Sequence, residues 1–308
     1  MYETINAALL AKAKDMLASG SVARVLGWQK GLFNYDITPA VFSSAEELGR
    51  EFVYNEFCGA NMSKYLIKES RKEGKILVFL KPCDTYSFNQ LIKEHRIIRE
   101  NVYAVGVPCD GMKDPESGET AERCLVCRGK KHVAYDELLS ADGVSCDESE
   151  LDAETAKKRF AKVAELEALS PAERFEFWRS ELSRCIRCNA CRNVCPACSC
   201  ELCVFDNPGS GVANKAPSDS FEENMFHIIR AFHVAGRCTD CGECSRVCPQ
   251  HIPLHLLNRK FIKDIDELYG DYQAGADTES RAPLNTYTTG DVEPSVVYER
   301  SSEKGGND

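Results

Sequence analysis

Two stretches of this sequence decide its fold: Cys185-Ile-Arg-Cys188-Asn-Ala-Cys191-Arg-Asn-Val-Cys195-Pro196 and Cys238-Thr-Asp-Cys241-Gly-Glu-Cys244-Ser-Arg-Val-Cys248-Pro249. Each has the spacing C-x2-C-x2-C-x3-C-P, the run with which bacterial ferredoxins hold 4Fe–4S clusters. Three cysteines at intervals of three wrap one cluster, and the fourth ligates the other cluster. The expected ligand sets are Cys185, Cys188, Cys191 and Cys248 for cluster 1, and Cys238, Cys241, Cys244 and Cys195 for cluster 2.

A pair of zinc sites is the alternative for these two runs. Zinc sites usually use two CxxC pairs each, and they do not need two triple runs that both end in Cys-Pro. The spacing therefore favours iron–sulfur clusters. The segment between the runs holds three more cysteines, Cys198, Cys200 and Cys203, which either ligate a metal, shield a cluster or pack as small apolar residues. A further cluster needs four ligands, so we expect the last two roles.

The composition supports metal ligation rather than disulfide bonding. The chain has 308 residues, 17 of them cysteine, and a formal net charge of −10, which argues against nucleic acid or an anionic membrane as the main partner. The first 20 residues read as an amphipathic helix rather than a signal peptide. The longest aliphatic run, 76–80, is far short of the roughly 20 residues that span a bilayer. We therefore expect a cytoplasmic protein whose thiols stay reduced.

The pattern along the chain divides it into four parts. Residues 1–150 alternate short strands and helices, which predicts an α/β domain with a mainly parallel sheet. The expected strands are 22–28, 76–80 and 102–107, and the expected helices are 45–54, 61–72 and 85–95. Residues 151–184 read as linker helices over about 155–168 and 171–184, and residues 185–271 as an α-helical, ferredoxin-like dicluster domain. Residues 272–308 read as an extended arm followed by a disordered tail.

Two helix features in the second half carry specific expectations. Ser170, followed by proline and then by Glu173, is the signature of a helix N-terminus. Residues 221–234 have the periodicity of an amphipathic helix that runs up to the second cysteine motif. His227 and His233 lie on this helix, and we expect both to be packing or polar-face residues rather than ligands.

A third metal site is predicted in the first domain. Cys83 follows the strand 76–80 within Lys-Pro-Cys-Asp, and Cys109 follows the strand 102–107 within Val-Pro-Cys-Asp. If these strands are parallel neighbours, both cysteines emerge at the same carboxyl edge, where open α/β sheets place their sites. Cys124 and Cys127 form a CxxC pair just downstream. A third 4Fe–4S cluster is the favoured interpretation, with zinc or no metal as alternatives, while Cys58 and Cys146 stand alone and are expected to be structural.

These segments resemble a known family. The matching segments are KPCDTYSFNQLIKE, VYAVGVPCDGM, CLVC, RCIRCNACRNVCPACSC and HVAGRCTDCGECSRVCP, within roughly residues 20–270. They are similar to the iron–sulfur beta-subunit group of anaerobic redox complexes. This group includes the beta subunits of deazaflavin-dependent hydrogenases and formate dehydrogenases and of sulfhydrogenases, and the anaerobic sulfite reductase A subunit. The resemblance implies a subunit that relays electrons between a flavin-bearing partner and another redox subunit, such as a hydrogenase, formate dehydrogenase or heterodisulfide-reductase-like module.

Two functions remain in competition. The first is a pure electron-transfer subunit, favoured because no general base, nucleophile or open metal site stands out. The second is an FAD-containing reductase or dehydrogenase beta subunit that exchanges hydride with a deazaflavin or a nicotinamide, because the resemblance implies that some deazaflavin-dependent members carry FAD. No GxGxxG motif is present, and those members do not use one. The basic cluster at 129–131 is expected to be a solvated turn rather than a phosphate site.

Overall fold

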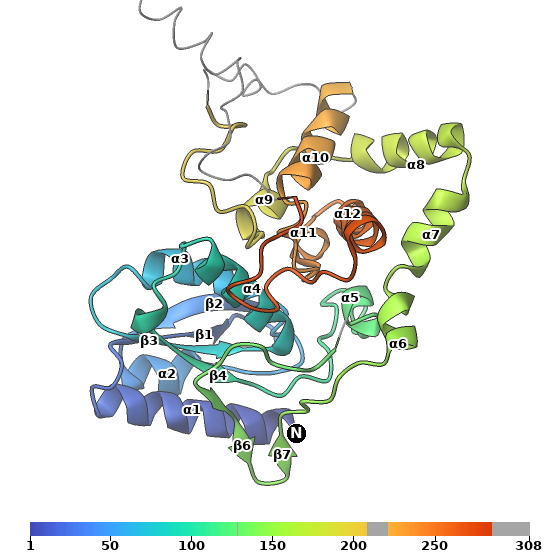
Figure 1. The fold of residues 1–308 in the computed structure, drawn as a ribbon. Coiled ribbons are helices and arrows are strands. Elements are labelled where there is room, and N and C mark those ends of the chain that lie inside the picture. Colours follow the sequence, from blue (N-terminus) through green and yellow to red (C-terminus); the bar gives the residue numbers. More distant parts are fainter. Residues whose placement is uncertain (128, 208–220, 285–308) are drawn as a thin grey trace, which may run out of the picture.

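The computed structural model describes residues 1–127, 129–207 and 221–284. An N-terminal α/β domain carries a helical domain built around the two cysteine motifs (Figure 1). Within the described residues, no helix combines the length and the apolar character that crossing a bilayer requires.

The N-terminal sheet has five strands in the order β2-β1-β3-β4-β5. Their bounds are β1 Arg24–Lys30, β2 Ile37–Phe42, β3 Ile76–Leu80, β4 Val102–Gly106 and β5 Glu137–Leu138. The strands β1, β3, β4 and β5 are parallel neighbours, and β2 pairs antiparallel with β1 at one edge. The sheet is therefore mainly parallel, as the sequence predicts. A short hairpin follows, with β6 Ser140–Ala141 and β7 Val144–Ser145.

Helices cover both faces of this sheet (Figure 1). Their bounds are α1 Tyr2–Ala18, α2 Ala45–Glu51, η1 Ser63–Tyr65, α3 Leu66–Glu69, α4 Pro82–Lys93, η2 Arg99–Asn101 and α5 Glu122–Leu125. Helix α1 buries Ile5, Leu9 and Ala13, which recur every four residues and so form one apolar face. All five residues of β3 are buried, as expected for a central parallel strand. This core fixes the carboxyl ends of β3 and β4.

The second half of the chain is helical. Its elements are α6 Ala153–Lys158, α7 Ala161–Ala168, α8 Pro171–Ser183, α9 Ala190–Val194, α10 Phe221–His233, α11 Glu243–Arg246 and α12 Leu254–Tyr269. The helix N-terminus predicted at Ser170 is present, and the structure adds a capping box: the Ser170 hydroxyl accepts a hydrogen bond from the Glu173 backbone N–H, and the Glu173 carboxylate accepts one from the Ser170 backbone N–H. Figure 1 shows α6, α7 and α8 rising along one side of the molecule toward α10.

The last described segment ties the two domains together. Residues 271–284, here called the C-terminal strap, contain neither helix nor strand and run between α4 and α12 (Figure 1). Tyr272 donates a hydrogen bond to the carbonyl of Gly236 at 3.1 Å. Gly275 lies so close to the carbonyl of Tyr86 in α4 that a Cβ atom on it would come within 1.9 Å of that oxygen. The tail expected beyond the strap lies outside the described residues.

Two helices differ from the sequence expectation. The segment 61–72 forms only η1 and α3, and residues 155–168 form two helices, α6 and α7, in place of one. The break between α6 and α7 falls at Arg159, whose guanidinium ion-pairs with Asp240 and Asp266 and whose carbonyl accepts from Arg259. These contacts with the helical domain coincide with a turn of the chain between α6 and α7, where the local periodicity alone favours one continuous helix.

Candidate metal centres

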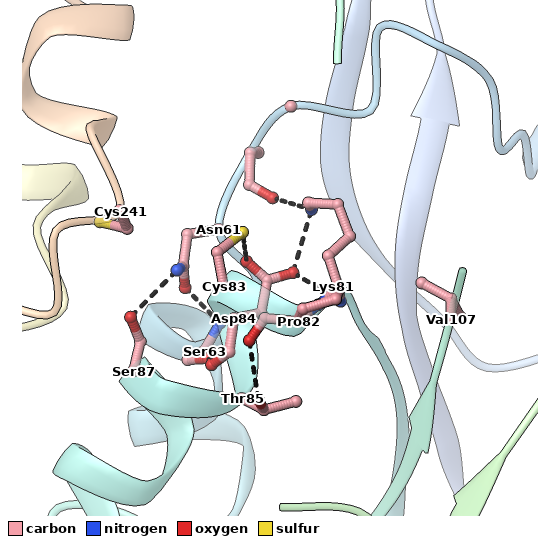
Figure 2. A network of polar contacts seen from close by, with 12 residues as sticks. Asn61, Ser63, Lys81, Pro82, Cys83, Asp84, Thr85, Ser87, Val107 and Cys241 are labelled. Carbon is pink, nitrogen blue, oxygen red and sulfur yellow. Dashed lines mark hydrogen bonds and ion pairs between the residues drawn. The ribbon is translucent and has the colours of Figure 1, made fainter. Parts of the chain in front are cut away.

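The four cysteines of the predicted third site line one cavity. Cys83 lies in the first turn of α4 directly after β3, and Cys109 follows β4. Because β3 and β4 are parallel with Leu80 opposite Gly106, both cysteines emerge at the same edge of the sheet. The cavity at this edge, here called the junction cavity, has five cysteines in its wall: Cys83, Cys109, Cys124, Cys127 and Cys241. Cys241 belongs to the second cysteine motif, so the cavity lies where the two domains meet (Figure 2).

A buried ion pair supports this edge. The Lys81 Nζ lies 3.0 Å from Asp84 Oδ2, and both side chains are almost completely buried. Lys81 also donates to the Ala60 carbonyl at 2.8 Å and lies over the Trp28 ring. Asp84 accepts a hydrogen bond from the Lys81 backbone N–H, and the Cys83 thiol lies 3.8 Å from its other oxygen (Figure 2). The Lys-Pro-Cys-Asp sequence therefore places a fixed cation close enough to Cys83 and Cys109 to interact electrostatically with both.

The junction cavity fits an anionic, thiolate-ligated group. Besides the cysteines, its wall includes four cationic side chains, Lys81, Arg123, Lys130 and Arg259, and two carboxylates, Asp110 and Asp240, which pair with Lys130 and Arg259. Four thiolates around a metal centre carry more negative charge than the metal neutralises, and nearby cations compensate for it. Burial raises the pKa of Cys83 well above its usual range and that of Cys109 to about 11. In the metal-free chain these thiols hold their protons, so metal binding must displace them.

The loops of the two cysteine motifs share an unusual backbone. In the first loop Arg187 and Asn189 have φ of 54° and 62°, and in the second Asp240 and Gly242 have φ of 57° and 70°. These are the second and fourth residues after the first cysteine of each motif. Left-handed non-glycine residues are costly and cluster at ligand sites. A short helix, α9 or α11, follows each loop, so the two motifs form equivalent structures.

The cysteines of the two motifs mix in the interior. Cys185 and Cys191 of the first motif pack in one apolar cluster with Cys244 and Cys248 of the second. In another cluster Cys195 packs with Cys238 and with Cys198. The last cysteine of each motif therefore lies beside the first cysteines of the other. Of the remaining predicted ligands, Cys188 is exposed and Cys241 faces the junction cavity.

The three cysteines that follow the first motif border a separate cavity. Cys198, Cys200 and Cys203 line it together with Arg192, Arg230 and His233. The Cys198 side chain packs against Cys195, and this interaction is the main reason why the pKa of Cys195 is lowered. Lys64 of the N-terminal domain donates to the Cys198 carbonyl.

The two lone cysteines of the N-terminal domain have polar partners. Cys58 is buried, and its sulfur accepts from the Asn55 backbone N–H at 3.2 Å. The Cys146 thiol lies 3.6 Å from the Gly106 carbonyl. Cys146, His132 and Glu148 bring three potential ligand atoms within 4.8 Å of one another, but both His132 nitrogens already have partners, in Glu148 and the Val107 carbonyl.

A polar network that the sequence does not predict joins the domains. Glu243, which precedes Cys244, is completely buried, and its carboxylate accepts hydrogen bonds from Arg123 and Arg246. Arg123 precedes Cys124 and also donates to the carbonyls of Cys241 and Gly59. Arg123 and Glu243 lie more than 100 positions apart, so no local pattern indicates the pairing. The one hint in the sequence is that each of the two residues directly precedes a predicted cysteine ligand.

Comparison with known proteins agrees with this geometry. Residues 181–252 match the family model described as a 4Fe-4S dicluster domain. The beta subunit of the F420-dependent formate dehydrogenase of Methanocaldococcus jannaschii is 24% identical over 90% of this chain and 93% of its own length. The beta subunit of F420-dependent formate dehydrogenase 1 of Methanococcus maripaludis is also 24% identical, over 90% and 92%. Ferredoxin-3 of Sinorhizobium fredii is 34% identical over 25% of this chain and 75% of its own length.

The helical domain and its cysteine motifs define a dicluster iron–sulfur protein. The similarity to the formate dehydrogenase beta subunits extends across both domains, so the chain resembles the iron–sulfur beta-subunit group of anaerobic redox complexes along most of its length. It is an iron–sulfur electron-transfer subunit.

Proposed function

We propose that this chain relays single electrons through three 4Fe–4S centres, two in the dicluster domain and one in the junction cavity. A bound 4Fe–4S cluster accepts and releases one electron with little rearrangement of its ligands. The observation that carries the proposal is the junction cavity itself. Four cysteines of the N-terminal domain and Cys241 of the second motif share its wall, so two ligand sets adjoin there.

The proposed ligand sets in the dicluster domain are crossed. Cys185, Cys188, Cys191 and Cys248 hold cluster 1, and Cys238, Cys241, Cys244 and Cys195 hold cluster 2. The mixed packing of the two motifs supports this assignment, because Cys248 lies with Cys185 and Cys191, while Cys195 lies with Cys238. The two sets are adjacent, since Cys244 contacts the group that contains Cys185.

The third set consists of Cys83, Cys109, Cys124 and Cys127. A single zinc ion bound by thiolates at 2.3 Å needs sulfur atoms roughly 3.8 Å apart. Across the described residues, the one group of three potential ligand atoms within 4.8 Å of one another is that of His132, Cys146 and Glu148. The wider spacing of the four cavity cysteines favours a cluster over zinc. Since Cys241 belongs to the cluster 2 set, the three sets follow one another as third set, cluster 2 and cluster 1.

The partners that we propose are a flavoprotein at one end of this row and a second redox subunit at the other, within a cytoplasmic complex. The relatives named above are beta subunits of F420-dependent formate dehydrogenases. A deazaflavin delivers hydride, a two-electron donor, whereas iron–sulfur centres take one electron at a time. A flavin between the two is the general solution to this mismatch. Substrate chemistry then belongs to the partner subunits.

An FAD within this chain is the second candidate, because another cavity adjoins the first. Cys109, Asp110 and Lys130 line both cavities. The lining of the second cavity disfavours a dinucleotide, however: it includes Asp110, Asp142 and Asp147, and the Lys130 ammonium already pairs with Asp110 at 2.9 Å. Two phosphates would meet a carboxylate-rich wall. We therefore favour a flavin on the partner.

Anaerobic purification from the native host, with identification of the co-purifying chains, tests the proposal. We expect about twelve irons and twelve acid-labile sulfides per chain, no flavin in this subunit, and a flavoprotein among the partners. About eight irons would remove the third centre. Flavin absorbance in the isolated chain would favour the second candidate, and zinc without sulfide would contradict both.

A further inference from the structure

Helix α10 carries two buried polar side chains, His227 and Arg230, that have no oxygen partner among the described residues, while the Arg230 guanidinium lies against the Cys244 sulfur. His227 and Arg230 each have only 1% of their surface exposed. Across the part of the chain that the structure describes, no hydrogen-bond partner lies at either ring nitrogen of His227 or at Nε, Nη1 or Nη2 of Arg230. The two residues are three positions apart and so lie on the same face of the helix. A buried guanidinium without an anionic partner is costly, which indicates that an anion belongs beside it.

The surroundings of Arg230 identify this anion. Its guanidinium interacts electrostatically with Cys244, Cys191 and Cys195, which come from both cysteine motifs and from both proposed ligand sets. Within the described residues, no carboxylate forms an ion pair with Arg230, although other buried arginines of this domain have one, such as Arg259 with Asp240 at 2.8 Å. Arg230 therefore faces the cysteine ligands themselves.

We infer that Arg230 is a donor to the iron–sulfur centres of the dicluster domain, and that its charge raises their reduction potentials. This inference rests on the proposed function. Reduction adds one electron from the partner subunit, makes the centre more negative by one charge and breaks no bond. A fixed positive charge close by stabilises the reduced form. Burial and the charges of Arg230 and Arg187 lower the pKa of His227 to about 3, so of the two buried polar residues on α10 only Arg230 is charged at pH 7.

The test is a redox titration, followed by electron paramagnetic resonance, of the anaerobically reconstituted full-length chain and of three variants. The variant Arg230→Met removes the charge, Arg230→Lys keeps it, and Arg179→Met is the control. Arg179 lies on α8 and forms an exposed pair with Glu176 at 2.7 Å, so its loss changes the net charge equally but in solvent. We expect Arg230→Met to lower the equilibrium constant for reduction of at least one dicluster centre roughly tenfold, which corresponds to a fall of about 59 mV in its reduction potential. Arg230→Lys should restore most of this shift and Arg179→Met should cause none.

Each outcome decides between explanations. Unchanged potentials in a fully loaded Arg230→Met variant would overturn the inference. If Arg230→Met binds no cluster but Arg230→Lys does, the positive charge is required and the inference stands. If neither variant binds clusters, the guanidinium serves packing and the inference is wrong. A wild-type chain that binds fewer than about eight irons contradicts the proposed function first and this inference with it.

Discussion

The Nη1 atom of Arg123 lies 2.5 Å from Oε1 of Glu243, in an ion pair that joins the two domains. Arg123 precedes Cys124 of the proposed third set, and Glu243 precedes Cys244 of the cluster 2 set. The contact is possible because Gly59 and Gly242 leave room for the Arg123 side chain: a Cβ on either residue would lie 2.9 Å from it. One ion pair therefore holds the two ligand sets in a fixed relation.

Loss of the Glu243 charge should destabilise the chain more than loss of Arg123. In Glu243→Gln, the arginines at 123 and 246 both lose their carboxylate, and removing one partner of a buried pair costs roughly 3–5 kcal/mol. In Arg123→Met, Glu243 keeps its pair with Arg246 at 2.7 Å, so the loss should be smaller. Anaerobic urea denaturation of the loaded protein measures both.

The exposed pair of Arg179 and Glu176 provides the control for this comparison. Glu176→Gln should change the free energy of unfolding by less than about 1 kcal/mol, because exposed pairs contribute little. Equal losses in Glu243→Gln and Arg123→Met would show that Arg246 does not hold the carboxylate.

Gly242→Ala should be more costly than a matched glycine substitution elsewhere. Gly242 has φ of 70° and lies against Arg123, whereas Gly20 has φ of 71°, and among the described residues no atom lies within 4 Å of the point that its Cβ would occupy. Both alanine variants incur the left-handed backbone cost of roughly 1–2 kcal/mol, and only the first also displaces Arg123. Thermal denaturation should rank them accordingly, and combining Gly242→Ala with Arg123→Ala should remove only part of the excess, because the Arg123 Cβ, 3.0 Å from the added methyl group, remains. Equal melting temperatures for the two single variants would show that Arg123 moves aside freely.

The fold of the N-terminal domain was predictable where local pattern and burial agree. The strand Ile76–Leu80 is uniformly apolar and is buried between parallel neighbours, so its apolar pattern correctly predicts a central strand. The strand Ile37–Phe42 is not predictable from its pattern, because it contains Pro39 and only one of its six residues is buried; a proline is tolerated there because the strand is at an edge. The hairpin of β6 and β7 has two residues per strand, too few for any periodicity.

The candidate centres were predictable only as far as cysteine spacing reaches. The spacing of the cysteines within each motif predicts the loop around each proposed cluster. The parallel pairing of β3 and β4 brings Cys83 and Cys109 to the same edge of the sheet. The position of Cys241 beside them depends on contacts between distant segments, such as Ser87 with Thr239 at 2.8 Å. The sequence predicts His227 to be a packing or polar-face residue, and the structure buries it; that its ring nitrogens have no hydrogen-bond partner among the described residues depends on the segments around it and cannot be read from its own helix.

Removal of the Cys198 thiol should leave the iron content unchanged. Its thiol lies against the side chain of the proposed ligand Cys195, so we expect Cys198→Ala to keep all clusters but to lower the potential of the centre that Cys195 ligates, since hydrogen bonds to thiolate sulfur favour the reduced form. Cys198→Ser keeps a donor and should shift the potential less. Iron and sulfide analysis with a redox titration measures both effects, and a loss of about four irons in either variant would make Cys198 a ligand.

Lys81 should serve both the fold and the proposed third centre, and two variants separate these roles. Lys81→Met leaves Asp84 buried without its cation, which should cost roughly 3–5 kcal/mol. Adding Asp84→Asn removes the unpaired charge, so the double variant should recover much of the free energy of unfolding. The double variant still lacks the cation close to Cys83 and Cys109, and we expect it to hold the third cluster weakly, with about eight irons retained after mild chelation against about twelve in the wild type. If the double variant keeps all twelve irons, the Lys81 cation is not needed to hold the third cluster. Its role would then be structural, namely to pair with Asp84.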